Sequence, residues 1–194
     1  ELTQRAASEG VSRESILEAE ALGVPAGSDG LLTVLDWLAP TDHPARKGMM
    51  LGFDARHTRG HLYRSIMEAI ALTMKFHVDA MMGELGVDLT DIVVSGGGAN
   101  SPLFMSIFAD AFGVPASRCV PAGGASLGAA KCAAAAVGVH PGIEQAAHRM
   151  APPRESFSPN AANTTIYARI NESVYPTIRT ATDPLYERAF PIFH

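Results

Sequence analysis

The residues best suited to chemistry lie in one short segment, Ser95-Gly96-Gly97-Gly98-Ala99-Asn100-Ser101. A run rich in β-branched residues, 91–95, leads into it, and Ser101 followed by Pro102 has the form of a helix start. Glycines have no Cβ, so a flat base or a phosphate can approach the backbone, and a helix start adds oriented N–H donors. The segment predicts a ligand-binding loop between a strand and a helix, with a tight turn without ligand as the alternative.

Two short patterns offer other chemistry. Gly96-x-Gly98 is the beginning of a dinucleotide-binding fingerprint, but Ser101 stands where the third glycine belongs, which argues against NAD. Gly124-x-Ser126-x-Gly128 matches the nucleophile elbow of serine hydrolases.

A hydrolase would need an acid and a histidine after the elbow serine, and Asp183 and His194 follow it in that order. His194 is the last residue, which is a poor place for a firmly held base. We therefore favour a packing role for Ser126 over a nucleophile.

Two further groups of polar residues are candidate sites. His57 and His61 lie four residues apart, as two zinc ligands on a helix face do, but without a third ligand nearby we expect a capping or surface role. Glu68 lies beside an apolar helix face, where a carboxylate is costly unless it is paired. It is either an exposed residue at the edge of that face or the partner of Arg64, four residues earlier.

The elements that must position these residues follow from periodicity and from start and stop signals. Apolar residues at three- and four-residue steps predict a long helix over 58–85, and the run 91–95 predicts a buried parallel strand. The run 31–38 has the length of either a strand or a helix, and 40–48 reads as a loop. Further helices are expected over 12–22, 101–112, 125–137, 143–150 and 163–180, and the last of them should bend at Pro176. A short strand is expected at 118–120, followed by a loop at 122–124. The end of the chain is expected to be irregular. The order strand, helix, strand, helix predicts an α/β layer with a parallel sheet.

Composition excludes several classes of function. The chain has 194 residues, a net charge of -5 and no run of Lys or Arg, so nucleic acid is not an expected partner. The most apolar stretch, 122–139, contains Lys131 and is shorter than the ~20 apolar residues of a membrane span. Cys119 and Cys132 lie in apolar surroundings and predict buried free thiols in a reducing cytoplasm.

Three stretches together resemble the C-terminal domain of FGGY carbohydrate kinases, members of the actin-like ATPase superfamily. Residues 48–53 and 61–68 are similar to the family's second signature, with Phe53 where an aliphatic residue is usual. Residues 95–110 resemble its adenosine-binding loop and helix, and 125–130 resemble the small-residue helix that packs behind the nucleotide. The loop 39–47 lacks the Gly-Glu-Arg-like element of many such sugar kinases, so it does not indicate the substrate.

The resemblance implies a partial actin-like ATPase, or ribonuclease H-like, α/β domain that binds ATP and Mg²⁺ in the cytoplasm. It assigns the nucleotide to Gly96, Gly97, Gly98, Ala99 and Ser101. The reaction would move the γ-phosphoryl group of ATP to a hydroxyl of a sugar or polyol, with a ketose as the expected acceptor. The sugar-binding domain, the phosphate loops and the catalytic Asp would precede Glu1, which is not a natural initiation residue. We therefore expect a fragment that holds neither catalytic residues nor metal ligands and is inactive alone.

We expect one C-terminal domain fragment in three segments: an N-terminal helix and linker at 1–26, a nucleotide-binding core at 27–150, and a helical extension at 151–194. A sugar or polyol would bind through the preceding domain, and a homodimer is an assembly that the resemblance leaves open. The rival function is a non-catalytic module for nucleotide binding or interaction.

Overall fold

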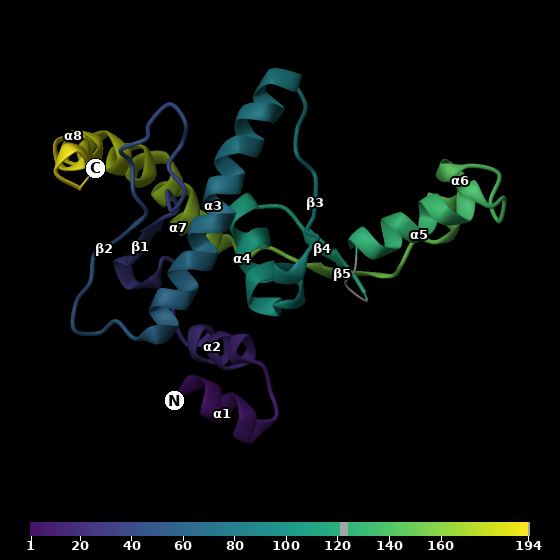
Figure 1. Cartoon of the computed structure of the whole chain (residues 1–194), viewed down its shortest axis with the longest axis horizontal. Coiled ribbons are helices and arrows are strands. Elements are labelled where there is room, and N and C mark those ends of the chain that lie inside the picture. The colour runs from purple at the N-terminus through teal and green to yellow at the C-terminus, as the bar shows by residue number, and fades with distance from the viewer. Residues whose placement is uncertain (121–123, 194) are drawn as a thin grey trace.

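The computed structural model describes residues 1–120 and 124–193, in which helices surround two small sheets (Figure 1). In chain order the elements are α1 (Leu2–Glu9), α2 (Arg13–Leu22), the 3-10 turn η1 (Ser28–Gly30), β1 (Leu32–Val34), β2 (Met49–Leu51), α3 (Arg59–Leu85), β3 (Ile92–Val93), η2 (Gly97–Asn100), α4 (Pro102–Phe112), β4 (Ala116–Cys119), α5 (Gly124–Ala136), α6 (Ile143–Arg149), β5 (Arg154–Phe157), α7 (Ala161–Arg169), the π-helix η3 (Ile170–Val174) and α8 (Tyr175–Phe193). Ala122 and Gly123 of the expected loop, and His194, lie outside the described residues.

Local capping starts and ends the helices as the sequence predicts. The Ser12 hydroxyl accepts a hydrogen bond from Ser15 N at 3.0 Å, and the Ser101 hydroxyl accepts one from Phe104 N at 3.0 Å. Gly113 ends α4 with a φ of 70°, which a glycine adopts without strain. The helices predicted at 12–22 and 101–112 are therefore confirmed, whereas α1 was not predicted.

The long helix α3 runs through the middle of the molecule and confirms the helix predicted at 58–85. Thr58 begins it with a capping box, in which the Thr58 backbone N–H and hydroxyl lie 3.2 and 2.9 Å from His61 Nδ1. Gly86 ends it in the left-handed conformation, with a φ of 64°. Figure 1 shows its first turns near α2 and its last turns rising beyond the other elements.

The core lies where α3, α4, α7 and β4 meet. Its buried side chains include Met67 and Leu72 of α3, Ile107 and Phe108 of α4, and Tyr167 of α7. The apolar face predicted for 101–112 therefore packs against the first half of α3, and this packing holds the start of α4 in place.

The larger sheet is mixed: β3 and β4 form the parallel pair that the sequence predicts, and β5 adds an antiparallel strand that was not predicted. β3 pairs with β4 in parallel, with Ile92 opposite Ala116, and β4 pairs with β5 antiparallel, with Ala116 opposite Phe157. The sequence did not reveal β5, because Arg-Glu-Ser-Phe has no alternating apolar pattern. The strand predicted at 91–95 is shorter than expected and is not buried, since Val93 is 47% exposed.

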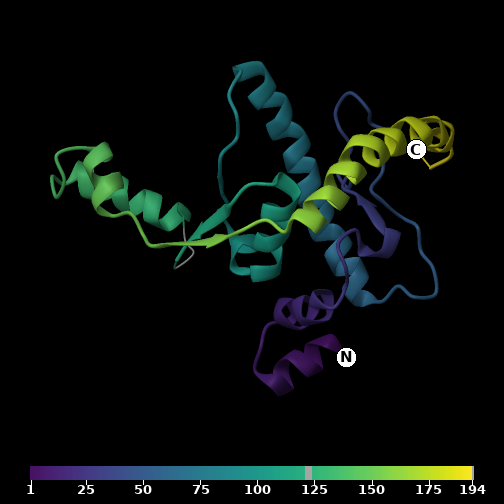
Figure 2. The same ribbon diagram turned by 180° about the vertical axis from the view of Figure 1, so that it is seen from behind.

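Helices α5 and α6 form an arm that extends away from α3 in both views (Figures 1 and 2). No described residue of α5 is buried, and Ser126 is exposed although α5 contacts α6. Cys132 is exposed and Cys119 is half-buried. The prediction of buried thiols is wrong for Cys132, because apolar neighbours in the sequence do not bury a side chain that the described elements leave uncovered.

The run 31–38 contains a strand, β1, which pairs antiparallel with β2. The loop that follows is tied to α8, because Arg46 donates to Asp183 at 2.8 and 2.6 Å.

The helix predicted at 163–180 extends to Phe193, so the expectation of an irregular end is wrong. Its irregularity is the π-helix η3, which ends two residues before Pro176. Among the described residues, no helix has the length and apolar character needed to cross a membrane.

Candidate functional site

The glycine segment folds as a compact turn between β3 and α4, as its spacing predicts. Gly96 has a φ of 107°, which L side chains rarely adopt. The turn closes through two backbone hydrogen bonds of 3.1 Å, from Ala99 N to the Gly96 carbonyl and from Ser101 N to the Gly98 carbonyl. The segment is therefore a defined loop at the carboxyl end of a parallel strand, where α/β sheets commonly bind ligands.

An open pocket of about 400 Å³ lies between this loop and the start of α5. Its described lining consists of small or uncharged polar residues: Ser95, Gly96, Gly97, Asn100, Gly124, Ala125 and Ser126. A Cβ on Gly124 would meet Ser95 Oγ at 2.5 Å, so the absence of a side chain there lets the two segments approach. The described lining offers hydroxyls, a carboxamide and bare backbone, and it contains no charged side chain.

The residues predicted to bind the ligand divide into two groups. Gly96 and Gly97 line the pocket, and a Cβ on Gly97 would meet nothing within 4 Å. Gly98 faces the helix, because a Cβ there would lie 2.6 Å from the Phe104 ring. Ala99 is 2% exposed, and its carbonyl accepts a hydrogen bond from Arg118 Nη1 at 2.6 Å. The structure therefore brings the first two to the pocket and places Gly98 and Ala99 behind it.

The beginning of α4 is already occupied by a carboxylate. The Ser101 hydroxyl donates to Glu18 Oε1 at 2.8 Å, and Leu103 N donates to the same oxygen at 2.9 Å. A negative charge at this position is favoured by the unpaired N–H groups and the dipole of the helix. Ser101 is therefore a cap held by α2, and this helix start is not free to receive a phosphate.

Sequence reasoning missed Asn100, which lines the pocket from the end of η2, and it missed Glu18. Asn100 stands inside the glycine segment, and its carboxamide, which can both donate and accept, was the signal available. Glu18 is 83 residues from Ser101, so no local spacing could have linked them.

Glu68 belongs to a buried network, and the interpretation that pairs it with Arg64 is confirmed. Glu68 is 4% exposed, so the alternative of an exposed edge residue is wrong. Its Oε1 accepts from Arg64 Nε at 2.8 Å, the Tyr167 hydroxyl at 2.8 Å and Gly27 N at 3.0 Å, and its Oε2 accepts from the Ser28 hydroxyl at 2.8 Å. Burial, reinforced by the Glu68 carboxylate, raises the pKa of Tyr167, which keeps its hydroxyl a donor. The network joins α3, α7 and η1 and has a structural role.

The histidine pair does not form a metal site in the part of the chain that the structure describes, where no group of three or more potential ligands could hold a metal ion. His61 caps α3 and lies 3.2 Å from an Asp29 carboxylate oxygen. His57 Nδ1 accepts from Asp54 N at 2.8 Å, and its side chain is only 1% exposed. The capping role is confirmed, but His57 is buried rather than on the surface.

The hydrolase interpretation has no support from the described residues. Ser126 lies on α5, and Asp183 lies on α8, where Arg46 binds its carboxylate with two hydrogen bonds. Figures 1 and 2 both place α5 and α8 on opposite sides of α3. The serine and the acid are therefore not brought together.

Comparisons with known proteins agree with the geometry. Residues 2–137 match the model of the FGGY family of carbohydrate kinases, C-terminal domain. The chain is 37% identical over 193 residues to the uncharacterized sugar kinase YgcE of Escherichia coli (strain K12), covering 100% of this chain and 39% of that protein. It is 33% identical over 174 residues to the ribulokinase of Halalkalibacterium halodurans, covering 83% of this chain and 30% of that protein.

The fold is likewise that of a solved sugar kinase. The crystal structure of xylulose kinase from Rhodospirillum rubrum matches with a TM-score of 0.72 and 29% identity, covering 90% of this chain and 35% of that one. The present chain thus spans less than two-fifths of these relatives. The family match over residues 2–137, the shared mixed α/β architecture of an actin-like ATPase domain, and the glycine loop at its strand end lead to one conclusion: the chain belongs to the FGGY family of carbohydrate kinases and carries its C-terminal domain.

Proposed function

We propose that this chain supplies the adenosine-binding half of the cleft in an ATP-dependent sugar or polyol kinase. The observation that carries the proposal is the uncharged pocket between the glycine loop and the start of α5. Gly96 and Gly97 have no side chains, which leaves room for a flat base. The Asn100 carboxamide can form hydrogen bonds with the polar edge of that base. Gly98, Ala99 and Ser101 hold the loop from behind.

The size and charge of the pocket fit a nucleoside better than a triphosphate. A cavity of about 150 Å³ holds benzene, so a volume of about 400 Å³ holds roughly 16 non-hydrogen atoms, the size range of a nucleoside. No charged side chain is among the described lining residues, and Glu18 occupies the start of α4. We therefore assign the phosphates to other parts of the full-length protein.

The proposed reaction moves the γ-phosphoryl group of Mg-ATP to a hydroxyl of the acceptor. The described residues contain no cluster that fits Mg²⁺, so we assign the metal and the catalytic base to no residue of this chain. The names of the relatives refer to ribulose and xylulose, which supports a ketose as the acceptor. We expect this chain alone to lack kinase activity, and the cytoplasmic location and the homodimer remain predictions.

Gly97→Ala tests the nucleotide site. The new methyl group would project into the open pocket without backbone strain, since Gly97 lacks a positive φ. In the full-length protein, ATP affinity measured by titration calorimetry should fall about tenfold, which is about 1.4 kcal/mol. Gly83→Ala is the matched control, because its Cβ also meets nothing within 4 Å but lies on α3, outside the pocket lining.

Equal ATP affinity in folded Gly97→Ala and Gly83→Ala would rule out adenosine at this loop. Substitution of Gly98 is a poorer test, because a Cβ at that position strikes Phe104 and would disturb folding as well as binding.

A further inference from the structure

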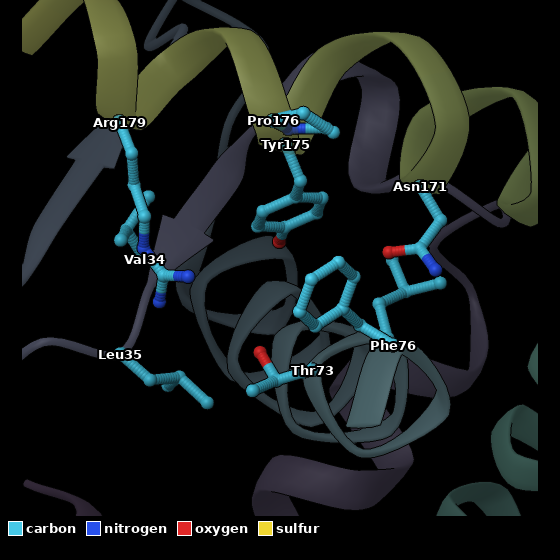
Figure 3. A pocket seen from close by; sticks show the side chains of 9 residues that line it. Val34, Leu35, Thr73, Phe76, Asn171, Tyr175, Pro176 and Arg179 are labelled. Atoms are coloured by element: carbon cyan, nitrogen blue, oxygen red, sulfur yellow. The ribbon is translucent and has the colours of Figure 1, made fainter. Parts of the chain in front are cut away.

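A second cavity lies on the other side of α3 from the glycine loop, where β1, α3, η3 and α8 meet (Figure 3). Its volume is about 220 Å³. Figure 3 shows Tyr175 reaching from α8 toward Thr73 and Phe76 of α3, while Arg179 lies beside Val34. None of the residues that line it belongs to the pocket proposed for the nucleotide.

Most of the cavity wall is apolar. One side is closed by Val34 of β1 and by Leu35, the residue directly after that strand. Another side is formed by Leu72 and Phe76 of α3. The Tyr175 ring adds an aromatic face, since its hydroxyl is turned away to donate to the Thr33 carbonyl at 2.8 Å. Such a wall favours a ligand with a flat apolar body.

Two polar side chains at the cavity are available for a ligand. Within the described residues, neither the Thr73 hydroxyl nor the Asn171 carboxamide has a hydrogen-bond partner. Asn171 belongs to the π-helix η3, a rare geometry that is frequent at functional sites. A free carboxamide presents a donor and an acceptor side by side, and its natural complement is a group that offers the same pair.

The charge at the cavity is balanced. Arg179 is the only charged side chain in the described lining, and it donates to the two oxygens of Asp36 at 3.0 and 3.3 Å. An anionic ligand would face Asp36, and a cationic ligand would face Arg179. The site therefore suits an uncharged molecule.

We propose that this cavity is a second ligand site, which binds a small uncharged aromatic molecule through one carboxamide-like group paired with Asn171. Scaling from the 150 Å³ that hold benzene, 220 Å³ accommodates about nine non-hydrogen atoms, the size of benzamide. The ring lies among Leu35, Phe76 and Tyr175, and the polar group meets Asn171 and Thr73.

The test uses benzamide as the probe, titrated against the full-length protein and followed by ligand-observed NMR. Saturable binding with a Kd of about 0.1–5 mM is expected for a fragment of this size. Benzoate, which adds a negative charge, and benzylamine, which adds a positive one, should each bind at least about fivefold more weakly.

Two variants examine the cavity and its polar group separately. Thr73→Phe fills the cavity and should weaken benzamide at least about tenfold, whereas Met74→Phe adds the same ring to the neighbouring exposed position and should change nothing. Asn171→Leu keeps the size and should weaken benzamide about two- to tenfold, while binding of toluene is unchanged. If Thr73→Phe fails to fold, Thr73→Leu serves as a smaller filling substitution.

Three results would overturn the proposal. The first is that benzamide shows no saturable binding to the folded protein up to about 20 mM. The second is that benzamide binds the wild type and a folded filling variant equally. The third is that benzoate binds with the same affinity as benzamide. Loss of ATP binding leaves these measurements intact, so the two sites are tested independently.

Discussion

The two halves of α3 share one regular backbone but have opposite surroundings. Most residues from Gly60 to Leu72 are buried, whereas no residue after Leu72 in this helix is. The apolar spacing continues to the end, yet Phe76 and Leu85 are 53% and 63% exposed. Periodicity thus predicts which face of a helix can be buried, but the neighbouring elements α2, α4 and α7 decide how far along the helix burial extends.

Two ion pairs make the contrast quantitative. Arg64–Glu68 in the first half and Lys75–Asp79 in the second are both four residues apart, and both are 2.8 Å long. The side chains of the first pair are 7% and 5% exposed, and those of the second are 21% and 50% exposed. The same spacing therefore produces a buried network in one half and a solvated surface pair in the other.

The largest effect is expected from Glu68→Gln. This substitution keeps the size of the side chain but leaves the Arg64 guanidinium buried without an opposite charge. We expect the free energy of unfolding of the chain to fall by about 3–5 kcal/mol, measured by urea titration. A loss below about 1 kcal/mol would mean that water reaches this network, and that the first half of α3 is more accessible to solvent than the structure indicates.

Truncation of apolar side chains should give the next largest difference between the halves. Leu72→Ala removes a side chain that is 2% exposed and should cost about 2–5 kcal/mol. Met81→Ala, at a position 49% exposed, should cost no more than about 0.5 kcal/mol. Similar losses in the two variants, measured from urea midpoints, would show that the second half of α3 is covered in solution.

Glycine substitutions should change stability in opposite directions. A Cβ on Gly60 would lie 2.6 Å from the Glu20 carbonyl oxygen of α2, so Gly60→Ala should destabilise the chain by about 1–3 kcal/mol. A Cβ on Gly83 meets nothing within 4 Å, so Gly83→Ala should stabilise the helix by about 0.5–1 kcal/mol. Thermal unfolding of both variants checks the signs, and a stabilised Gly60→Ala would contradict the close contact of α2 with α3.

The smallest effect is expected from Asp79→Asn. An exposed pair four residues apart contributes about 0.3–0.5 kcal/mol, and salt screens it. The difference in unfolding free energy from the wild type should therefore disappear in about 1 M NaCl, where the screening length is about 3 Å. A loss of stability that persists in high salt would show that the Lys75–Asp79 pair is shielded from solvent, as the Arg64–Glu68 pair is.

The sequence predicted much of the fold where the cause is local. Ser12, Thr58 and Ser101 begin helices, because each forms its cap with a residue only three positions further along the chain. At Ser12 and Ser101 the partner is a backbone N–H, and at Thr58 it includes the His61 side chain. The glycine loop was predicted for the same reason, since the strand, the turn residues and the helix start are consecutive. The division of the chain into three segments remains a prediction.

Prediction failed where the partner is distant in sequence or where no partner is present. β5 is a strand only because β4 lies beside it, and Cys132 is exposed because none of the described elements covers that side chain. In the glycine loop, Gly98 and Ala99 differ from Gly97 in orientation, and only the position of Phe104 and Arg118 shows this.

By itself, the sequence determined the caps that begin α2, α3 and α4 and the strand-to-helix glycine loop, because each depends on residues within a few positions of one another. It also carried the family resemblance in three separate stretches. Tertiary structure alone decided that Glu18 occupies the start of α4, that Glu68 binds Tyr167 across 99 residues, and that only the first half of α3 is buried. The physical reason is that burial and pairing of polar groups depend on which surfaces meet, and apolar spacing along one helix does not specify its neighbours.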